Sequence, residues 1–370
     1  MEERMKSLNR VGGLAIVLSM WWVSGAVAQI QIGRYLTING YSSFEYEKLL
    51  GDEGKGDPNG SFDADLFDLV LNITPTDRLR IASDITFEHG AASEDNRGNV
   101  AVEYAFGEYT VMNALRFRAG KMFTPFGIYN EIHTAKPAFL TVKEPLSTNK
   151  NHKFGSALRF YPRWATGLAV LGDGTLSGID FDYIVQLSNG EQSFTNPYEE
   201  DDNKAKALSA RLRFIPADGV QVGLSFYRDM LSTYIEDDQG ELTVADEQIH
   251  LLSYGAQAEW NSGNFGVEFE YVFGFIDPES GVKISRDAFT AMVYYLIKDR
   301  FTPYVRYEYL NPNQDLDNDG ANQFIYGVNI NIDRGLFVKM EFNTVSAQRE
   351  NQRFKGKAYT EFKAAVAIGF

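Results

Sequence analysis

Apolar and polar residues alternate with a period of two along most of the chain. In the last segment Phe362, Ala364, Val366, Ile368 and Phe370 form one face, and Glu361 and Lys363 begin the other. Because successive side chains of a β-strand point to opposite sides, the alternation predicts strands with one apolar face. Sixteen strands are predicted, over residues 31–48, 62–73, 78–88, 99–111, 115–123, 156–171, 175–188, 204–215, 220–230, 248–261, 264–276, 284–297, 300–311, 322–332, 335–346 and 356–370. Pro162 interrupts the sixth.

The connections between these segments alternate between short and long. Tight turns are expected at 74–77, 216–219, 262–263, 298–299 and 333–335, and the intervening connections run to ten or more residues. This asymmetry is typical of transmembrane barrels. An even number of antiparallel strands lets the first pair with the last and leaves no edge in lipid. We therefore expect an all-β fold, a transmembrane antiparallel β-barrel of about 16 strands around an aqueous lumen.

The first 28 residues have the layout of a secretory signal peptide. Arg4, Lys6 and Arg10 precede an apolar stretch over 11–25, and the sequence Ala-Val-Ala over 26–28 supplies small residues at a cleavage position. The apolar stretch is short for a membrane helix, and no run of eighteen apolar residues follows it. The predicted division is a signal peptide over 1–28 and an outer-membrane barrel over 29–370. Since the chain has no cysteine, an exported barrel would hold together without disulfides.

Charge and composition limit the kinds of partner that the protein can bind. The formal net charge of −15 argues against non-specific binding of nucleic acid. The 27 Phe and 20 Tyr suit strands with interfacial aromatic belts. Much of the acid lies in predicted loops, over 45–57, 191–202, 236–247 and 315–319, where solvated surface is the plain interpretation.

The longest interruption of the alternation, over 124–155, is a candidate constriction loop that folds into the barrel. Loops of this length are usually functional or disordered, and this one is rich in apolar residues and proline. Between Asn113 and Ala165 lie nine basic residues and two acidic ones, a charge of +7 within an acidic chain. The parity of the flanking strands directs Arg116, Arg118, Arg211 and Arg213 toward the lumen.

These features give a set of candidate pore-lining residues: Arg116, Arg118, Lys121, Lys136, Lys143, Arg159, Arg211 and Arg213. The alternation places Lys121 on the lipid-facing side of its strand, so either the alternation breaks at this residue or the strand has already left the membrane. Rings of Arg and Lys favour anions in pores. The alternative is that these residues neutralise lumenal carboxylates, such as Glu103, Glu268, Glu270, Glu308 and Glu341, in salt-bridge networks across the barrel.

Two segments resemble known patterns. The sequence from Arg118 to Gly127, followed by Tyr129-Asn130-Glu131, resembles the segment after an early strand in the phosphate-selective porin O and P family. That resemblance implies a trimeric sixteen-stranded channel with an inward-folded loop and a basic constriction, from which the overall acidity of this chain departs. The terminal Phe370 resembles the signal by which the barrel-assembly machinery recognises outer-membrane proteins.

A calcium site is one interpretation of the outer loop over 315–320. Asp315, Asp317 and Asp319 followed by Gly320 match the opening of a calcium loop. Position twelve is Tyr326 and not Glu, so the bidentate ligand of such loops is missing. An acidic turn between strands is the other interpretation, and apart from this weak Ca²⁺ site no cofactor is expected.

No catalytic motif appears around His89, His133, His152 or His250, and no catalytic residue is predicted. The expected function is a porin of the Gram-negative outer membrane, a channel for passive diffusion of small hydrophilic solutes with anions or phosphate as candidates for preference. A plugged structural or adhesive barrel and a barrel enzyme are the alternatives. The expected partners are lipid, lipopolysaccharide, the assembly machinery and two further copies in a homotrimer, with no nucleic acid.

Overall fold

The computed structural model describes residues 29–50, 58–88, 99–132, 135–147, 159–190, 201, 203–236, 242–350 and 356–370. The predicted signal peptide, His133, Lys150, His152 and Lys153 lie outside the described residues. Among the residues that are described, no helix is long and apolar enough to cross a membrane.

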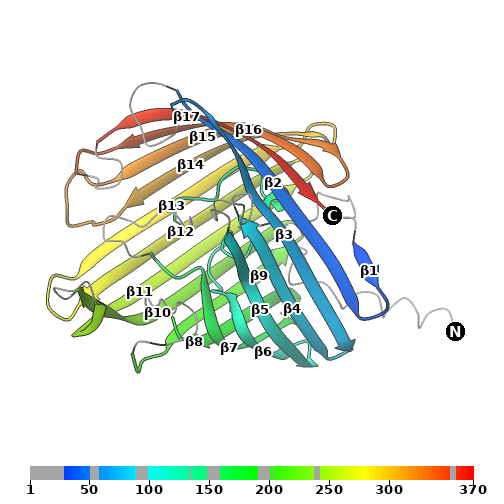
Figure 1. The fold of residues 1–370 in the computed structure, drawn as a ribbon, viewed down its shortest axis with the longest axis horizontal. Coiled ribbons are helices and arrows are strands. Elements are labelled where there is room, and N and C mark those ends of the chain that lie inside the picture. Colours follow the sequence, from blue (N-terminus) through cyan, green and yellow to red (C-terminus); the bar gives the residue numbers. More distant parts are fainter. Residues whose placement is uncertain are drawn as a thin grey trace.

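Nearly all of the described chain is β-strand (Figure 1). The elements are β1 (Ile30–Ile32), β2 (Leu36–Leu50), β3 (Ser61–Thr76), β4 (Leu79–Glu88), β5 (Asn99–Met112), β6 (Leu115–Phe123), η1 (Lys136–Ala138), β7 (Trp164–Leu176), β8 (Ile179–Ser188), β9 (Ala207–Ala217), β10 (Val220–Glu236), β11 (Leu242–Ser262), β12 (Phe265–Pro278), β13 (Ile284–Tyr295), β14 (Phe301–Asn311), β15 (Ala321–Asp333), β16 (Leu336–Ala347) and β17 (Ala358–Gly369). Each strand from β2 to β17 pairs antiparallel with the next, and β17 pairs with β2. The result is a closed sixteen-stranded antiparallel barrel, as the alternation predicted.

Two details of the prediction are wrong. The sixth predicted strand was placed over 156–171, but β7 begins at Trp164, and residues 159–163 lie beside the inside of the wall. The ring of Pro162 supplies no N–H to a ladder, and Phe160 and Tyr161 pack instead in the interior. The connections between β12 and β13 and between β14 and β15 are also shorter than ten residues, because they comprise only residues 279–283 and 312–320.

The two faces of the wall have opposite character. On β7, Leu168 is 62% exposed whereas its neighbour Ala169 is 3% exposed. On β14, Val305 is 44% exposed on the outside, and Arg306 and Glu308 on the inside are 1% exposed. Apolar side chains outward and polar ones inward are what a barrel surrounded by lipid requires.

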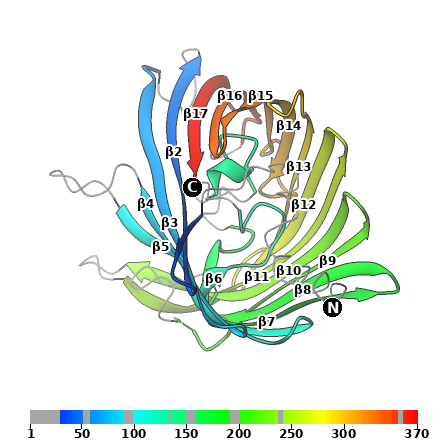
Figure 2. The same cartoon turned by 90° about the vertical axis from the view of Figure 1, so that its right-hand side faces the viewer.

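The interior is occupied by the segment between β6 and β7, which we call the inward loop (described residues 124–132, 135–147 and 159–163). Figure 2 shows η1 and the segments beside it inside the ring of strands. Phe126 and Phe160 of this loop are fully buried in one apolar cluster with Tyr227, Leu251 and Val272 of β10, β11 and β12. The largest buried apolar cluster among the described residues therefore joins the loop to one side of the wall.

The barrel closes where β17 meets β2, from Thr360 opposite Leu50 to Gly369 opposite Tyr41. Beyond this ladder, the Gly40 and Phe370 backbones exchange two hydrogen bonds of 2.9 and 2.8 Å. A Cβ on Gly40 would lie 2.3 Å from the Phe370 ring and 2.7 Å from the Asp68 carbonyl oxygen. The absence of a side chain at Gly40 therefore lets the Phe370 ring lie flat against the closing strands.

We predict that Gly40→Ala lowers the free energy of unfolding by about 1–3 kcal/mol, because the added methyl must displace the Phe370 ring or the strand backbone. The measurement is the urea midpoint of the purified protein in detergent. Gly107→Ala is the matched control, since a Cβ at this strand position meets nothing within 4 Å. Equal midpoints for the two variants would contradict a stabilising role for the Gly40–Phe370 contact.

Candidate pore constriction

The inward loop begins with a sharp turn that only glycine fits. Gly127 has φ +62°, and a Cβ there would lie 2.1 Å from the Glu270 carboxylate. That carboxylate accepts a 2.6 Å hydrogen bond from the N–H of Ile128. Before the turn, the Phe126 ring stacks on Tyr161 with centroids 4.1 Å apart. The segment that resembles the porin family thus contains the turn that sends the chain into the lumen.

Carboxylates of the wall accept hydrogen bonds from the backbone of the inward loop. Besides the bond from Ile128 to Glu270, the N–H of Val142 donates to Glu341 at 2.8 Å and that of Leu146 donates to Glu308 at 2.7 Å. These three carboxylates lie on β12, β14 and β16, where they are at most 1% exposed. They provide the partners that a strand ladder would otherwise provide.

Basic side chains of the wall donate to the carbonyl groups of the same loop. Arg211 donates to Gly127 at 3.2 Å, Arg286 to Arg159 at 2.5 Å and Arg306 to Lys143 at 3.0 Å. Lys339 donates to three carbonyls, those of Lys136, Phe139 and Thr141, at 2.5, 2.5 and 3.1 Å. A buried carbonyl or N–H without a partner costs about 1–3 kcal/mol. The charges of the wall therefore hold the loop by its backbone.

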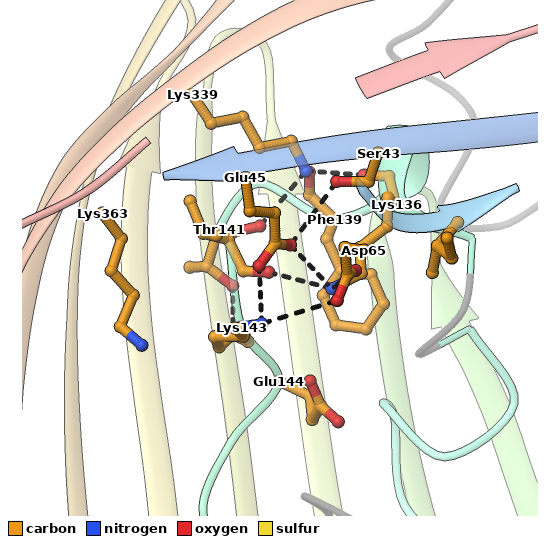
Figure 3. A network of polar contacts seen from close by, with 12 residues as sticks. Ser43, Glu45, Asp65, Lys136, Phe139, Thr141, Lys143, Glu144, Lys339 and Lys363 are labelled. Atoms are coloured by element: carbon orange, nitrogen blue, oxygen red, sulfur yellow. Dashed lines mark hydrogen bonds and ion pairs between the residues drawn. The ribbon is translucent and has the colours of Figure 1, made fainter. Parts of the chain in front are cut away.

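The loop lysines bind carboxylates on β2 and β3 (Figure 3). Lys136 lies 3.2 Å from Glu45 and 3.2 Å from Asp65. Lys143 lies 2.5 Å from Glu45, 3.4 Å from Glu47 and 3.7 Å from Asp65. Both predicted pore-lining lysines thus belong to one ion-pair network that joins the loop to the first strands of the barrel.

The electrostatics of this network keep both lysines charged. Burial disfavours the ammonium of Lys143, but Glu45, Asp65 and Glu47 outweigh burial and raise its pKa well above the ordinary value. Burial acts in the same direction on Lys136, and Glu45 and Asp65 again raise the pKa above its ordinary value. These two groups therefore stay protonated through the physiological range.

Arg211 and Arg213 of β9 lie at the other end of the loop. Arg211 forms an ion pair with Glu131, and Arg213 donates to Asp182 at 2.9 and 3.0 Å. Burial raises the pKa of Glu131, but the two arginines outweigh burial and hold it below its ordinary value. The carboxylate of Glu131 is therefore ionised at neutral pH, opposite Arg211.

The remaining predicted arginines of this region also have acidic partners. Arg116 lies 2.8 Å from Asp173 on β7, and Arg118 donates to Glu108 on β5 at 2.7 Å. The Arg118 guanidinium also lies 4.2 Å from the centre of the Phe106 ring. Both arginines thus pair with carboxylates of the strands next to β6, and not with the carboxylates that the sequence suggested as partners across the barrel.

Two predicted pore-lining residues have different surroundings. Lys121 donates to the Val102 carbonyl, and its ammonium lies 5.4 Å from the centre of the Trp164 ring. It stands on the face of β6 opposite to that of Arg116 and Arg118. For Arg159, the described contact is made by its carbonyl, which accepts from Arg286.

The acidic outer loop does not gather its carboxylates. Asp315 and Asp317 are exposed, whereas Asp319 is 4% exposed. In the described part of the chain, no group of three or more His, Asp or Glu side chains has the arrangement of a metal site. The calcium interpretation therefore gains no ligand cluster from the fold.

Sequence reasoning missed the acids that pair with the loop lysines. The ladder between β2 and β3 shifts register between Ser43 and Glu45, and this bulge accompanies the turn of Asp65 toward Lys136. It also missed Lys339 as a loop contact, although the alternation placed Lys339 on the polar face of its strand. The available signal was a basic residue on the inward face of a predicted strand.

We predict that Gly127→Ala destabilises the protein more than Gly33→Ala. Both glycines have nearly the same positive φ, +62° and +61°, but a Cβ at Gly33 meets nothing within 4 Å. Gly33→Ala should cost about 1–2 kcal/mol for the left-handed conformation alone. Gly127→Ala should cost about 1–3 kcal/mol more, because the Ile128–Glu270 hydrogen bond must break. Urea midpoints measure both, and equal losses would show that the Glu270 contact does not hold the turn.

Comparison with known proteins finds a distant sequence relative. No protein-family model matches the chain. A segment of 199 residues is 27% identical to an uncharacterised protein of Aquifex aeolicus, and the match covers 53% of this chain and 40% of that protein. The chain thus matches less than half the length of this relative.

Similar solved structures cover nearly the whole chain. OmpT of Vibrio cholerae is 13% identical with a TM-score of 0.61, over 92% of this chain and 100% of that one. OmpF of Salmonella typhi, in complex with daunomycin, is 11% identical with a TM-score of 0.63, over 92% and 100%. An anion-selective porin of Comamonas acidovorans is 10% identical with a TM-score of 0.60, over 90% and 99%. At these identities the likeness is one of fold: the chain has a porin-like outer-membrane barrel, and membership of the phosphate-selective porin O and P family stays a prediction.

Proposed function

We propose that the protein is an outer-membrane channel through which small hydrophilic solutes diffuse without a chemical step. The observation that supports this most is the attachment of the inward loop to the inside of the wall. The contacts described above join the loop to β2, to β3, to the strands from β9 to β14 and to β16. A loop fixed to these strands narrows a sixteen-stranded lumen without needing to fill it.

The wall from β5 to β8, with Arg213 of β9, would form the other side of the passage. Its inward charges pair with each other between neighbouring strands, Arg118 with Glu108, Arg116 with Asp173 and Arg213 with Asp182. These side chains are between 8% and 26% exposed, so they are accessible to water in part. Neutral pairs of opposite charge along a narrow passage favour polar solutes over apolar ones.

Pairing also weakens the case for strong anion preference. That preference was inferred from a charge of +7 between Asn113 and Ala165. Some carboxylates that pair with these basic residues lie outside this stretch of sequence, namely Glu45, Asp65, Glu108 and Asp173. With Arg116, Arg118, Lys136 and Lys143 matched by carboxylates, we propose weak ion selectivity. Preference for phosphate has no separate support.

Location and partners complete the proposal. The porin-like fold and the apolar outer face support residence in a bacterial outer membrane, in contact with lipid and lipopolysaccharide. One of the similar structures, OmpT of Vibrio cholerae, is described in a trimer form, which supports a homotrimer here. Recognition by the barrel-assembly machinery through Phe370 is part of the same proposal.

We predict that the purified protein conducts ions in planar lipid bilayers. Under a tenfold KCl gradient its reversal potential should stay well below the roughly 59 mV of a perfectly selective monovalent pore. A folded, heat-modifiable protein that gives no current would contradict the channel and favour the plugged structural or adhesive barrel. A reversal potential near the anion limit would restore the anion-selective interpretation of the basic loop.

A further inference from the structure

We infer that Lys339 is the positioning residue that fixes the inward loop, and hence the width of the passage, although Lys339 itself does not face the water. The inference rests on the proposed function for its electrical readout. Its structural readout, the accessibility of the loop, does not depend on that function.

The geometry around Lys339 carries the inference. Its ammonium is surrounded by three carbonyl oxygens of the loop, those of Lys136, Phe139 and Thr141, at 2.5, 2.5 and 3.1 Å. An ammonium has three hydrogens, so this cage uses every donor of the group. Lys339 is 1% exposed, and a buried charge is tolerated only when it is fully hydrogen-bonded.

The three carbonyls also explain why one side chain can set the position of a whole segment. They belong to η1 and to the residues that follow it, so the ammonium links three points within a stretch of six residues. Asn329 of β15 donates to the same Phe139 carbonyl at 3.2 Å. Without the ammonium, the carbonyls of Lys136 and Thr141 lose this buried donor, and the segment gains by moving to water.

The opposite side of this segment is held by a different kind of contact. Lys143 binds Glu45 and Glu47, but its side chain is 27% exposed and that of Glu47 is 35% exposed. Salt screens exposed ion pairs strongly and buried contacts weakly. The segment is therefore held by the buried contact of Lys339 on β16 and by ion pairs on β2 and β3, of which those of Lys136 are buried and those of Lys143 are partly exposed. Figure 3 shows Lys339 and Glu45 reaching the same short stretch of loop.

The test uses a single cysteine as a reporter of loop position. The chain has no cysteine, and Val142, which is 2% exposed, lies between Thr141, bonded by Lys339, and Lys143, bonded by Glu45. In a Val142→Cys background, Lys339→Met should raise the rate of maleimide labelling about tenfold or more, the factor that corresponds to roughly 1.4 kcal/mol. In bilayers, Lys339→Met should change the single-channel conductance and increase the open-channel noise.

Lys363→Met is the matched control. Lys363 is a buried inward lysine of the neighbouring strand β17, and its ion pairs go to Glu47 and Glu361 of the wall at 3.0 and 3.4 Å. Labelling in this variant should stay within about twofold of the parent, as expected when no hydrogen bond to the loop is lost. If Lys339→Met labels at the parental rate while the barrel remains heat-modifiable, the inference is wrong.

A comparison at two salt concentrations needs no change at Lys339, so it can still overturn the inference if Lys339→Met does not fold. Labelling of Val142→Cys should be nearly equal in about 0.1 M and about 1 M KCl, since the buried contacts of Lys339 and Lys136 are screened only weakly. A several-fold faster reaction at high salt would show that exposed ion pairs hold the loop, and would overturn the role of Lys339. Absence of current from the parent protein would refute the channel alone, because the labelling outcomes stand without it.

Discussion

Every backbone N–H and C=O inside a barrel needs a hydrogen-bond partner, and the inward loop has no neighbouring strand to supply one. In the wall, the closed ring of β2 to β17 meets this requirement with ladders. In the loop, charged side chains of the wall meet it instead. Glu270, Glu308 and Glu341 accept from loop N–H groups, and Lys339 and Arg306 donate to loop carbonyls. The position of the loop depends on these contacts.

This requirement changes the role that we assign to the charged side chains of the lumen. A basic side chain on an inward face can attract anions only if its charge is not already matched. Here Lys136 and Lys143 bind carboxylates of β2 and β3, and Lys339 is enclosed by carbonyl oxygens. The charges that remain partly exposed occur as pairs of opposite sign, such as Arg116 with Asp173. The proposed channel would therefore separate solutes mainly by size and polarity.

The sequence predicts the fold better than the site, for a physical reason. The period of two is a local property, so it located sixteen strands and the face on which Arg211, Lys339 and Glu341 lie. It misplaced the start of β7 because Pro162 ends the ladder while the apolar pattern continues through Phe160 and Tyr161. Contacts inside the lumen join residues far apart in the chain, as in the pair of Lys136 with Glu45, and the bulge beside Asp65 follows from strand register. Neither can be read from a window of sequence.

The most direct test of this account is amide hydrogen exchange at Ile128, Val142 and Leu146 in the folded protein. Their N–H groups donate to the side-chain carboxylates of Glu270, Glu341 and Glu308, and not to the backbone of a strand. If the wall carboxylates hold the loop, these three amides exchange orders of magnitude more slowly than those of exposed outer-loop residues such as Asp317. Exchange of all three at the rate of such exposed residues would contradict the account, because the loop would then be free of the wall.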